Sequence, residues 1–262
     1  MIKIKMHAMY DHFPDLTPKE EQPYIDCYSD SYVFECKEPG KNIALLLEPR
    51  SMLRDADKYV EEHADYFRYI FTHDSKLLQL PQARELNWAD VWLTTDSPKT
   101  KGISLMTSYK NWCPLHKARL ELADFYKDRP EVDVFYGDWN NPHIPVIEAK
   151  DYLEHYKFSI IIENDIDEYW YTEKILNCFA TKTVPIYVGA TCIHRRFDAD
   201  GIITVSNYKD IPRIIEHLNI DEAYANRKVA IERNFELVKP YNVKWKERFF
   251  RDYGSLLEGL NG

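Results

Sequence analysis

Phe158-Ser-Ile-Ile-Ile-Glu-Asn164, then Tyr171-Thr-Glu-Lys174, then Val184-Pro-Ile-Tyr-Val-Gly189 are the three segments that decide the fold. The first is an apolar, β-branched run that ends in a polar pair, which predicts a buried strand. Thr-Glu-Lys predicts the beginning of a helix, and the third segment predicts a second buried strand that a glycine ends. Polar side chains at the carboxyl end of a strand, beside a helix amino terminus, form the usual ligand site of open α/β sheets.

This predicted strand–helix junction is suited to an anion. Backbone N–H groups and the helix dipole at an amino terminus favour negative charge, and phosphate is the usual ligand. Lys174 adds a full positive charge in the first helical turn. The same spacing also fits an ordinary β–α–β crossover in which the polar residues only cap the helix, so the pattern alone leaves both interpretations open.

Composition limits the class of protein and its partners. The 262 residues, 45% apolar and 29% charged, indicate a soluble globular protein with room for two domains. The formal charge of −9 argues against nucleic acid or an anionic membrane as the principal partner. Five scattered cysteines without a C-x-x-C pair predict reduced thiols. No apolar run reaches spanning length, so we expect a cytoplasmic protein without an integral membrane segment.

Strand and helix patterns alternate along the chain, which predicts parallel sheets. We expect strands over residues 2–6, 42–48, 69–73, 91–95, 103–108, 132–136, 158–163, 184–188 and 202–205. We expect helices over residues 51–67, 115–127, 148–156, 172–181, 210–218, 221–237 and 242–258.

A polar, proline-bearing segment at residues 94–101 is the predicted linker. It divides the chain into an α/β domain over residues 1–98, a second α/β domain over 99–240, and a C-terminal helix in 241–262 that packs back across the domains. A single doubly wound domain is the structural alternative.

The motifs Phe-x-x-x-x-Glu-Asn, Tyr/Thr-Glu-Lys and Val-Pro-x-x-x-Gly together resemble the donor-binding signature of family 10 glycosyltransferases. These are the α-1,3/4-fucosyltransferases with their bacterial and viral relatives. The resemblance is dense over residues 103–206 and thinner outside them. It implies a GT-B fold, in which two Rossmann-like domains flank a cleft and C-terminal helices close the structure. The first domain would then face the acceptor and the second would bind the nucleotide-sugar donor. Animal members are membrane-anchored, so this chain looks more like the soluble bacterial or viral branch.

The resemblance also implies roles on the donor side. Arg119 and Lys174 would hold the diphosphate, because arginine offers planar, bidentate donors and lysine a point charge. Glu173 would accept hydrogen bonds from ribose hydroxyls, and Asn164 would bind the nucleotide. Trp170 stands where the family usually has tyrosine and is followed by Tyr171; we place both at the donor site. Without the resemblance, the sequence predicts that Arg119 is a solvated residue on an amphipathic helix. Glu173 is then a first-turn carboxylate that interacts favourably with the helix dipole.

On the acceptor side, an inverting transferase needs a general base that takes a proton from the acceptor hydroxyl. The family's glutamate at the end of a first-domain strand corresponds to Glu48, and an apolar strand end would raise its pKa. The alternative is a glutamate paired with Arg50. Weaker acceptor-side candidates are His73, Asp74, Tyr10 and Asp11, which follow other predicted strands.

These residues predict an inverting, metal-independent glycosyltransferase that moves a sugar from a nucleotide-sugar donor, GDP-fucose, to a glycan acceptor. No metal site and no cofactor beyond the GDP-sugar co-substrate are expected. Asp165 and Asp167 form an Asp-x-Asp pair, but their position suits a solvated loop. Two alternatives remain: the same fold with a different nucleotide sugar, and a glycan- or nucleotide-binding module without catalysis.

Overall fold

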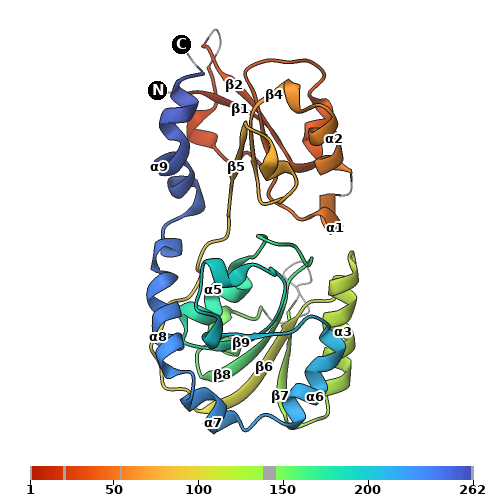
Figure 1. Ribbon diagram of the computed structural model, residues 1–262, viewed down its shortest axis with the longest axis vertical. Helices are drawn as coiled ribbons and strands as arrows, with labels where there is room; N and C mark the ends of the chain where they lie inside the picture. Colours follow the sequence, from red (N-terminus) through yellow and green to blue (C-terminus); the bar gives the residue numbers. More distant parts are fainter. Residues whose placement is uncertain (1, 20–21, 54, 138–145, 261–262) are drawn as a thin grey trace. The chain divides into compact units, whose positions relative to one another are not determined.

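The computed structural model describes residues 2–19, 22–53, 55–137 and 146–260, and the chain divides into two compact units (Figure 1). The first unit runs to Trp88 and also includes the chain from Lys244 onward, whereas the second covers Ala89–Val243. The division therefore precedes the predicted linker at residues 94–101, and both ends of the sequence contribute to the first unit.

The first unit contains a parallel sheet in the order β1-β2-β3-β4-β5. Its strands are β1 Ile4–His7, β2 Ile25–Ser29, β3 Asn42–Leu45, β4 Phe67–Thr72 and β5 Ala83–Glu85. Its α-helices are α1 Arg50–Leu53, α2 Ala56–Glu62 and α9 Trp245–Glu258. Its 3-10 turns are η1 Pro14–Leu16, η2 Asp30–Glu35, η3 Ala64–Tyr66 and η4 Leu77–Gln79.

Strand β3 is buried on both faces, which explains its continuous apolar run. Ile43 and Leu45 pack in one core cluster, and Ala44 packs in the other. Helix α9 covers the first cluster, where Phe249 lies against Phe71 with ring centroids 4.8 Å apart. The C-terminal helix thus completes the core of the first unit (Figure 1).

The second unit contains a parallel sheet in the order β10-β9-β8-β6-β7. Its strands are β6 Lys101–Thr107, β7 Val132–Tyr136, β8 Tyr156–Ile162, β9 Val184–Val188 and β10 Ile203–Thr204. Its α-helices are α3 Pro114–Tyr126, α4 Ala149–Leu153, α5 Glu173–Ala180, α6 Ile211–Glu216, α7 Ile220–Ala225 and α8 Lys228–Leu237. Its 3-10 turns are η5 Ile193–Arg195, η6 Ala199–Gly201, η7 Tyr208–Asp210 and η8 Lys239–Asn242.

Strand β8 is likewise buried on both faces. Ile160 and Ile162 pack in the cluster that α3 and α6 cover, whereas Ile161 packs in the cluster that α5 covers. This two-sided burial confirms the α/β class and the predicted strand at residues 158–163, and it fixes the polar residues after β8 at one edge of the sheet.

Several predicted elements differ from the structure. Strand β3 ends at Leu45 instead of continuing to Glu48, because the amides of Leu47 and Glu48 donate to Asp30 Oδ1 (2.8 and 3.2 Å) and not to a neighbouring strand. Residues 221–237 form α7 and α8, which a turn at Asn226 separates. Residues 51–67 are divided among α1, α2 and η3.

The strand expected at residues 91–95 is absent from the described structure. The amides of Val91, Trp92 and Thr95 donate to Tyr241 O (3.0 Å), Asn177 Oδ1 (2.8 Å) and Ala180 O (3.0 Å). Because these acceptors belong to α5 and to η8, the segment is anchored to helices and does not pair with a sheet.

The cysteines are free thiols, as predicted; Cys192 is partly exposed and the other four are buried. Among the described helices, none has the length and apolarity needed to cross a bilayer.

Candidate functional site

A cavity of about 350 Å³ lies in the second unit, where the carboxyl ends of β6 and β8 meet the amino ends of three helices. Ser108 and Lys110 follow β6, and Asn164 follows β8. The first two turns of α3 and the first turn of α5 bring the other polar groups. The charged and polar side chains that line it include Lys110, His116, Arg119, Asn164, Glu173 and Lys174. This is the position at which open α/β sheets bind ligands.

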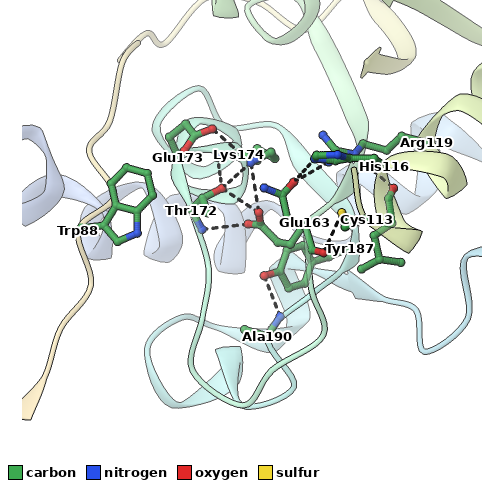
Figure 2. A network of polar contacts seen from close by, with 12 residues as sticks. Trp88, Cys113, His116, Arg119, Glu163, Thr172, Glu173, Lys174, Tyr187 and Ala190 are labelled. Atoms are coloured by element: carbon green, nitrogen blue, oxygen red, sulfur yellow. Dashed lines mark hydrogen bonds and ion pairs between the residues drawn. The ribbon is translucent and has the colours of Figure 1, made fainter. Parts of the chain in front are cut away.

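Glu163 lies beneath the cavity as a carboxylate with no exposed surface (Figure 2). Its Oε1 accepts from the Thr172 amide (2.9 Å), and its Oε2 accepts from the Thr172 hydroxyl (2.7 Å). Lys174 Nζ lies 3.4 Å from the same Oε2. A buried carboxylate needs such partners, so Glu163 ties the end of β8 to the beginning of α5.

Thr172 caps α5 and also holds the lysine. Its hydroxyl oxygen accepts from the Lys174 amide (3.4 Å) and from Lys174 Nζ (3.0 Å). Lys174 Nζ further donates to Glu173 Oε1 at 3.3 Å. Burial lowers the pKa of the Lys174 ammonium, but the carboxylates of Glu173 and Glu163 outweigh burial and raise it. Lys174 is therefore charged at neutral pH and held at the helix amino terminus.

A second set of contacts converges on Asn164. The amide of Trp112 donates to His116 Nδ1 (3.2 Å), so the ring proton lies on Nε2, which donates to Asn164 Oδ1 (3.0 Å). Arg119 Nη2 donates to the same oxygen at 2.6 Å (Figure 2). With two donors on its oxygen, Asn164 would meet a ligand through its NH₂ group, as a hydrogen-bond donor.

The two residues that position Asn164 differ in charge. Burial first, and then the charge of Arg119, lowers the pKa of His116 to about 4, so the imidazole is neutral at pH 7. Burial lowers the pKa of Arg119 while the charge of Glu163 opposes that effect, and a guanidinium stays protonated at neutral pH. Lys174 and Arg119 thus supply two positive charges at the cavity, against the formal charge of −9 for the chain.

Gly189, which ends the Val-Pro-x-x-x-Gly motif, has a steric explanation. A β-carbon at Gly189 would overlap the Glu163 side chain and the Tyr187 ring, and Tyr187 is itself fully buried. The Tyr187 hydroxyl accepts from the Ala190 amide at 2.9 Å (Figure 2). Glycine therefore allows β9 to end directly against the buried carboxylate.

Four of the predicted donor-side residues, Arg119, Asn164, Glu173 and Lys174, line this one cavity. The other two do not line it: Trp170 and Tyr171 are only 2% and 3% exposed. Tyr171 packs in the core cluster under α5, and its hydroxyl bonds to that of Tyr241 (2.6 Å). The structure therefore does not support ligand contacts for these two aromatic residues at this cavity.

The acceptor-side candidates lie in the first unit. Glu48 is half-buried in the loop after β3. Arg50 Nε contacts Asp74 Oδ2 (2.6 Å) and Asp57 Oδ2 (3.0 Å). Burial opposes ionisation of Asp74, but the hydrogen bond from Arg50 and the backbone amides of Leu77 and Lys76 lower its pKa overall.

The remaining candidates have structural contacts of their own. Burial lowers the pKa of His73 to about 4. Asp11 is exposed and accepts from the Phe13 amide (2.9 Å) and the Thr17 hydroxyl (3.0 Å), whereas Tyr10 is 71% exposed. None of the four weaker candidates, Asp74 included, lines the cavity of the second unit, and they stay weak candidates.

Sequence reasoning missed several residues at the site. It gives Glu163 only as part of a motif, without a role, and it does not identify Lys110, His116 and Trp92 as lining residues. The spacing of His116 three residues before Arg119 on a helix was a usable signal, because such residues share a face. Asp165 and Asp167 accept from the nearby amides of Ile166 and Tyr169. Among the described residues, no group of three or more His, Cys, Asp or Glu could hold a metal ion.

Comparisons with known proteins agree with this geometry. Residues 97–252, more than half of the chain, match the sequence model described as glycosyltransferase family 10 (fucosyltransferase), C-terminal. The α-(1,3)-fucosyltransferase FucT of Helicobacter pylori is 26% identical over 81 residues. That match covers 31% of this chain and 17% of the length of the relative.

Solved structures resemble the fold. A crystal structure of an α1,3-fucosyltransferase has a TM-score of 0.52 at 14% identity, over 88% of this chain and 78% of that one. TarM has a TM-score of 0.55 at 12% identity, over 89% and 54%. The GtfA/B complex has a TM-score of 0.54 at 10% identity, over 90% and 57%. These similarities confirm the predicted GT-B class of fold, and the match over residues 97–252 shows that the chain belongs to glycosyltransferase family 10, the fucosyltransferase family.

Proposed function

We propose that the protein is an inverting, metal-independent glycosyltransferase that transfers L-fucose from GDP-fucose to a hydroxyl of a glycan. The observation that carries this proposal is the convergence of Arg119, Asn164, Glu173 and Lys174 on one cavity at the amino terminus of α5. Two cations, a hydrogen-bond donor and a carboxylate are the groups that a nucleoside diphosphate needs. The family name and that of the H. pylori relative support fucose as the sugar.

On the donor side, Lys174 and Arg119 would bind the diphosphate. Negative charge accumulates on the leaving diphosphate as the bond to the sugar breaks, and fixed cations stabilise it there. Lys174 would exchange part of its contact with Glu173 for a phosphate oxygen, which leaves the Glu173 carboxylate to accept from the two ribose hydroxyls. Asn164 would donate to the nucleotide. Because positive charge comes from side chains, the reaction as proposed needs no metal.

On the acceptor side, Glu48 would act as the general base. Its carboxylate takes the proton from the acceptor hydroxyl while that oxygen attacks the anomeric carbon, and the bond from that carbon to the diphosphate breaks on the opposite face. One such displacement inverts the anomeric configuration. Asp30, through its hydrogen bond to the Glu48 amide, holds the loop that carries the base.

The direct test is incubation with GDP-fucose and a panel of glycan acceptors, with GDP release and product formation as readouts. We expect acceptor-dependent GDP release that persists in excess EDTA, and a product whose anomeric configuration, measured by NMR, is inverted relative to the donor. Loss of activity in EDTA that Mg²⁺ restores would contradict metal independence. Retained configuration would contradict single displacement.

The identity of the donor has its own test. A thermal-shift screen of GDP-, UDP- and dTDP-sugars separates the candidates, because a ligand at a hundred times its dissociation constant stabilises by ~2.7 kcal/mol. We expect the largest shift with GDP-fucose. A larger shift with another nucleotide sugar would reassign the donor and keep the enzyme class, whereas binding without turnover for any acceptor would favour a recognition module.

A further inference from the structure

Trp92 is an exposed aromatic side chain on the wall of the cavity. Its residue surface is 56% exposed, although an indole is the largest apolar side chain and is usually well buried. It lines the 350 Å³ cavity and also a neighbouring hollow of about 420 Å³, and Ala149 lines both. The two hollows therefore share a wall that includes an indole. An aromatic ring that lines a cavity, in contrast to one that stands alone on an open surface, is placed to stack on a flat ligand.

The backbone of Trp92 is attached to the helix that carries the donor-side charges. Asn177 Oδ1 accepts from the Trp92 amide (2.8 Å) and from the Leu93 amide (3.4 Å), and Asn177 has no exposed surface. Asn177 lies on α5, one turn after Glu173. The main chain of Trp92 is thus held beside the helix that carries Glu173 and Lys174 by a partly buried hydrogen bond.

The other lining residues near this part of the chain are suited to a flat, apolar group. Ala149 and Tyr152 belong to α4, and Ile147 precedes it. The cationic and amide groups, in contrast, come from α3, from α5 and from the residue after β8. In a nucleoside diphosphate the base is joined to the ribose and the ribose to the phosphates, so the ligand has one aromatic end and one anionic end. The lining residues supply a partner for each end.

We infer that Trp92 stacks on the nucleobase of the bound donor, an inference that rests on the nucleotide-sugar donor of the proposed function. Stacking uses the face of the base and not its edge, so Trp92 would supply affinity for any purine and would not discriminate guanine from adenine. A pyrimidine offers a smaller face and would gain less. Choice of guanine would then depend on other groups.

The experiment measures dissociation constants of GDP, ADP, UDP and inorganic pyrophosphate for the wild type, Trp92→Ala and Trp92→Phe. Phe125→Ala is the matched control, because Phe125 is 42% exposed in the same unit, has the Arg129 guanidinium over its ring and does not line the cavity. Pyrophosphate has no base, so it reports on the charged groups alone. Unchanged pyrophosphate affinity in each variant also shows that the fold of the unit is intact.

We expect Trp92→Ala to weaken GDP and ADP by about 5- to 100-fold, the range for loss of one base–aromatic stack, and UDP by less. Trp92→Phe should keep part of the affinity, and pyrophosphate binding and the Phe125→Ala variant should match the wild type. Equal GDP affinity in wild type and Trp92→Ala would overturn the inference, as would an equal loss for pyrophosphate. If the wild type binds no nucleotide, the proposed function fails with it; if the wild type binds GDP and only the Trp92 effect is absent, the inference alone fails.

Discussion

The two units are built alike, yet they use the polar residues after their strands differently. Each has a five-stranded parallel sheet with a strand buried on both faces. In the second unit, the residues after β6 and β8 and the first turns of α3 and α5 line one cavity. In the first unit, Asp74 after β4 binds Arg50 and the amides of Lys76 and Leu77.

The difference shows that a charged residue after a strand is not by itself a site. Three cations, Lys110, Arg119 and Lys174, line this cavity, against one lining carboxylate, Glu173, and the buried carboxylate of Glu163 beside Lys174, so the balance of charge is positive. The Asp74 carboxylate instead pairs with Arg50 and accepts a hydrogen bond from the Leu77 amide in the turn that follows β4, so its role is structural. Under the proposed function, the second unit would bind the donor on its own, and the first unit would add chemistry chiefly through Glu48.

The sharpest test of this division is Glu48→Gln. General-base catalysis contributes about 10²–10⁴-fold, so turnover of GDP-fucose with acceptor should fall by that factor. The dissociation constant of GDP should not change, because the donor-side groups all lie in the second unit. Glu62→Gln, an exposed glutamate on α2, is the control. Wild-type turnover in Glu48→Gln would remove this residue from the mechanism.

The second test removes a cation from the other unit. Lys174→Met should raise the dissociation constant of GDP by roughly 10- to 100-fold, because a hydrogen bond to a charged group contributes about 1.5–3 kcal/mol. Isothermal titration measures the effect. Lys182→Met is the matched control. Lys182 follows the same helix, pairs with Asp96 and Glu232, and does not line the cavity. An equal loss in both variants would indicate a general charge effect.

The third test compares the units through one buried histidine in each. Burial lowers the pKa of both His73 and His116 to about 4, below the ordinary value of 6.5. Between those two pH values the unfolded chain binds more protons than the folded one, so the free energy of unfolding falls as pH is lowered from about 6.5 to about 4. Each histidine contributes a slope of up to ~1.4 kcal/mol per pH unit.

Urea unfolding at several pH values measures this slope, and His73→Gln and His116→Gln should each reduce it. Asp74 acts in a lower window: its pKa is already below the ordinary carboxyl value, so its contribution is lost only as pH falls below about 4. A slope that neither substitution changes would mean that other groups control the acid sensitivity.

The smallest expected effect concerns thiol reactivity. The folded protein should react rapidly at one thiol, Cys192, because the other four are buried and burial raises the pKa values of Cys27, Cys36 and Cys178. Labelling with a chromogenic disulfide reagent, with and without urea, counts the reactive thiols. Cys192→Ser should remove the fast phase. Rapid reaction of a thiol in the first unit would mean that this unit opens more readily than its packing indicates.

The sequence predicted those parts of the fold that depend on interactions between residues close together in the chain. Strand β9 matches its predicted range, and Thr172 caps α5 where Thr-Glu-Lys indicated a helix start. The apolar run, the cap and the glycine lie within about thirty residues of one another and act over short distances. The same segments also contain three of the predicted residues that line the cavity, Asn164, Glu173 and Lys174, whereas the family resemblance indicated the fourth, Arg119.

Other features depend on contacts that spacing does not reveal. Leu46 and Leu47 are buried, so the apolar run continues beyond the end of β3. Only the hydrogen bonds that Asp30 Oδ1 accepts from the Leu47 and Glu48 amides show that the strand has ended. Asp30 is seventeen residues away from Leu47 and has a left-handed backbone (φ 52°). The two tryptophans differ for the same reason: Trp170 is buried and Trp92 is exposed because of packing with distant segments.

Helix α9 gives the first unit a particular order of assembly. The ribosome delivers the strands of this unit first, then the whole second unit, and only afterwards the residues that place Trp245, Phe249 and Leu257 in the first core. Domains generally fold as they emerge, so the second sheet can be complete while the first still exposes the apolar face that α9 later covers. A nascent chain arrested after residue 243 should therefore bind GDP while its first unit remains sensitive to protease.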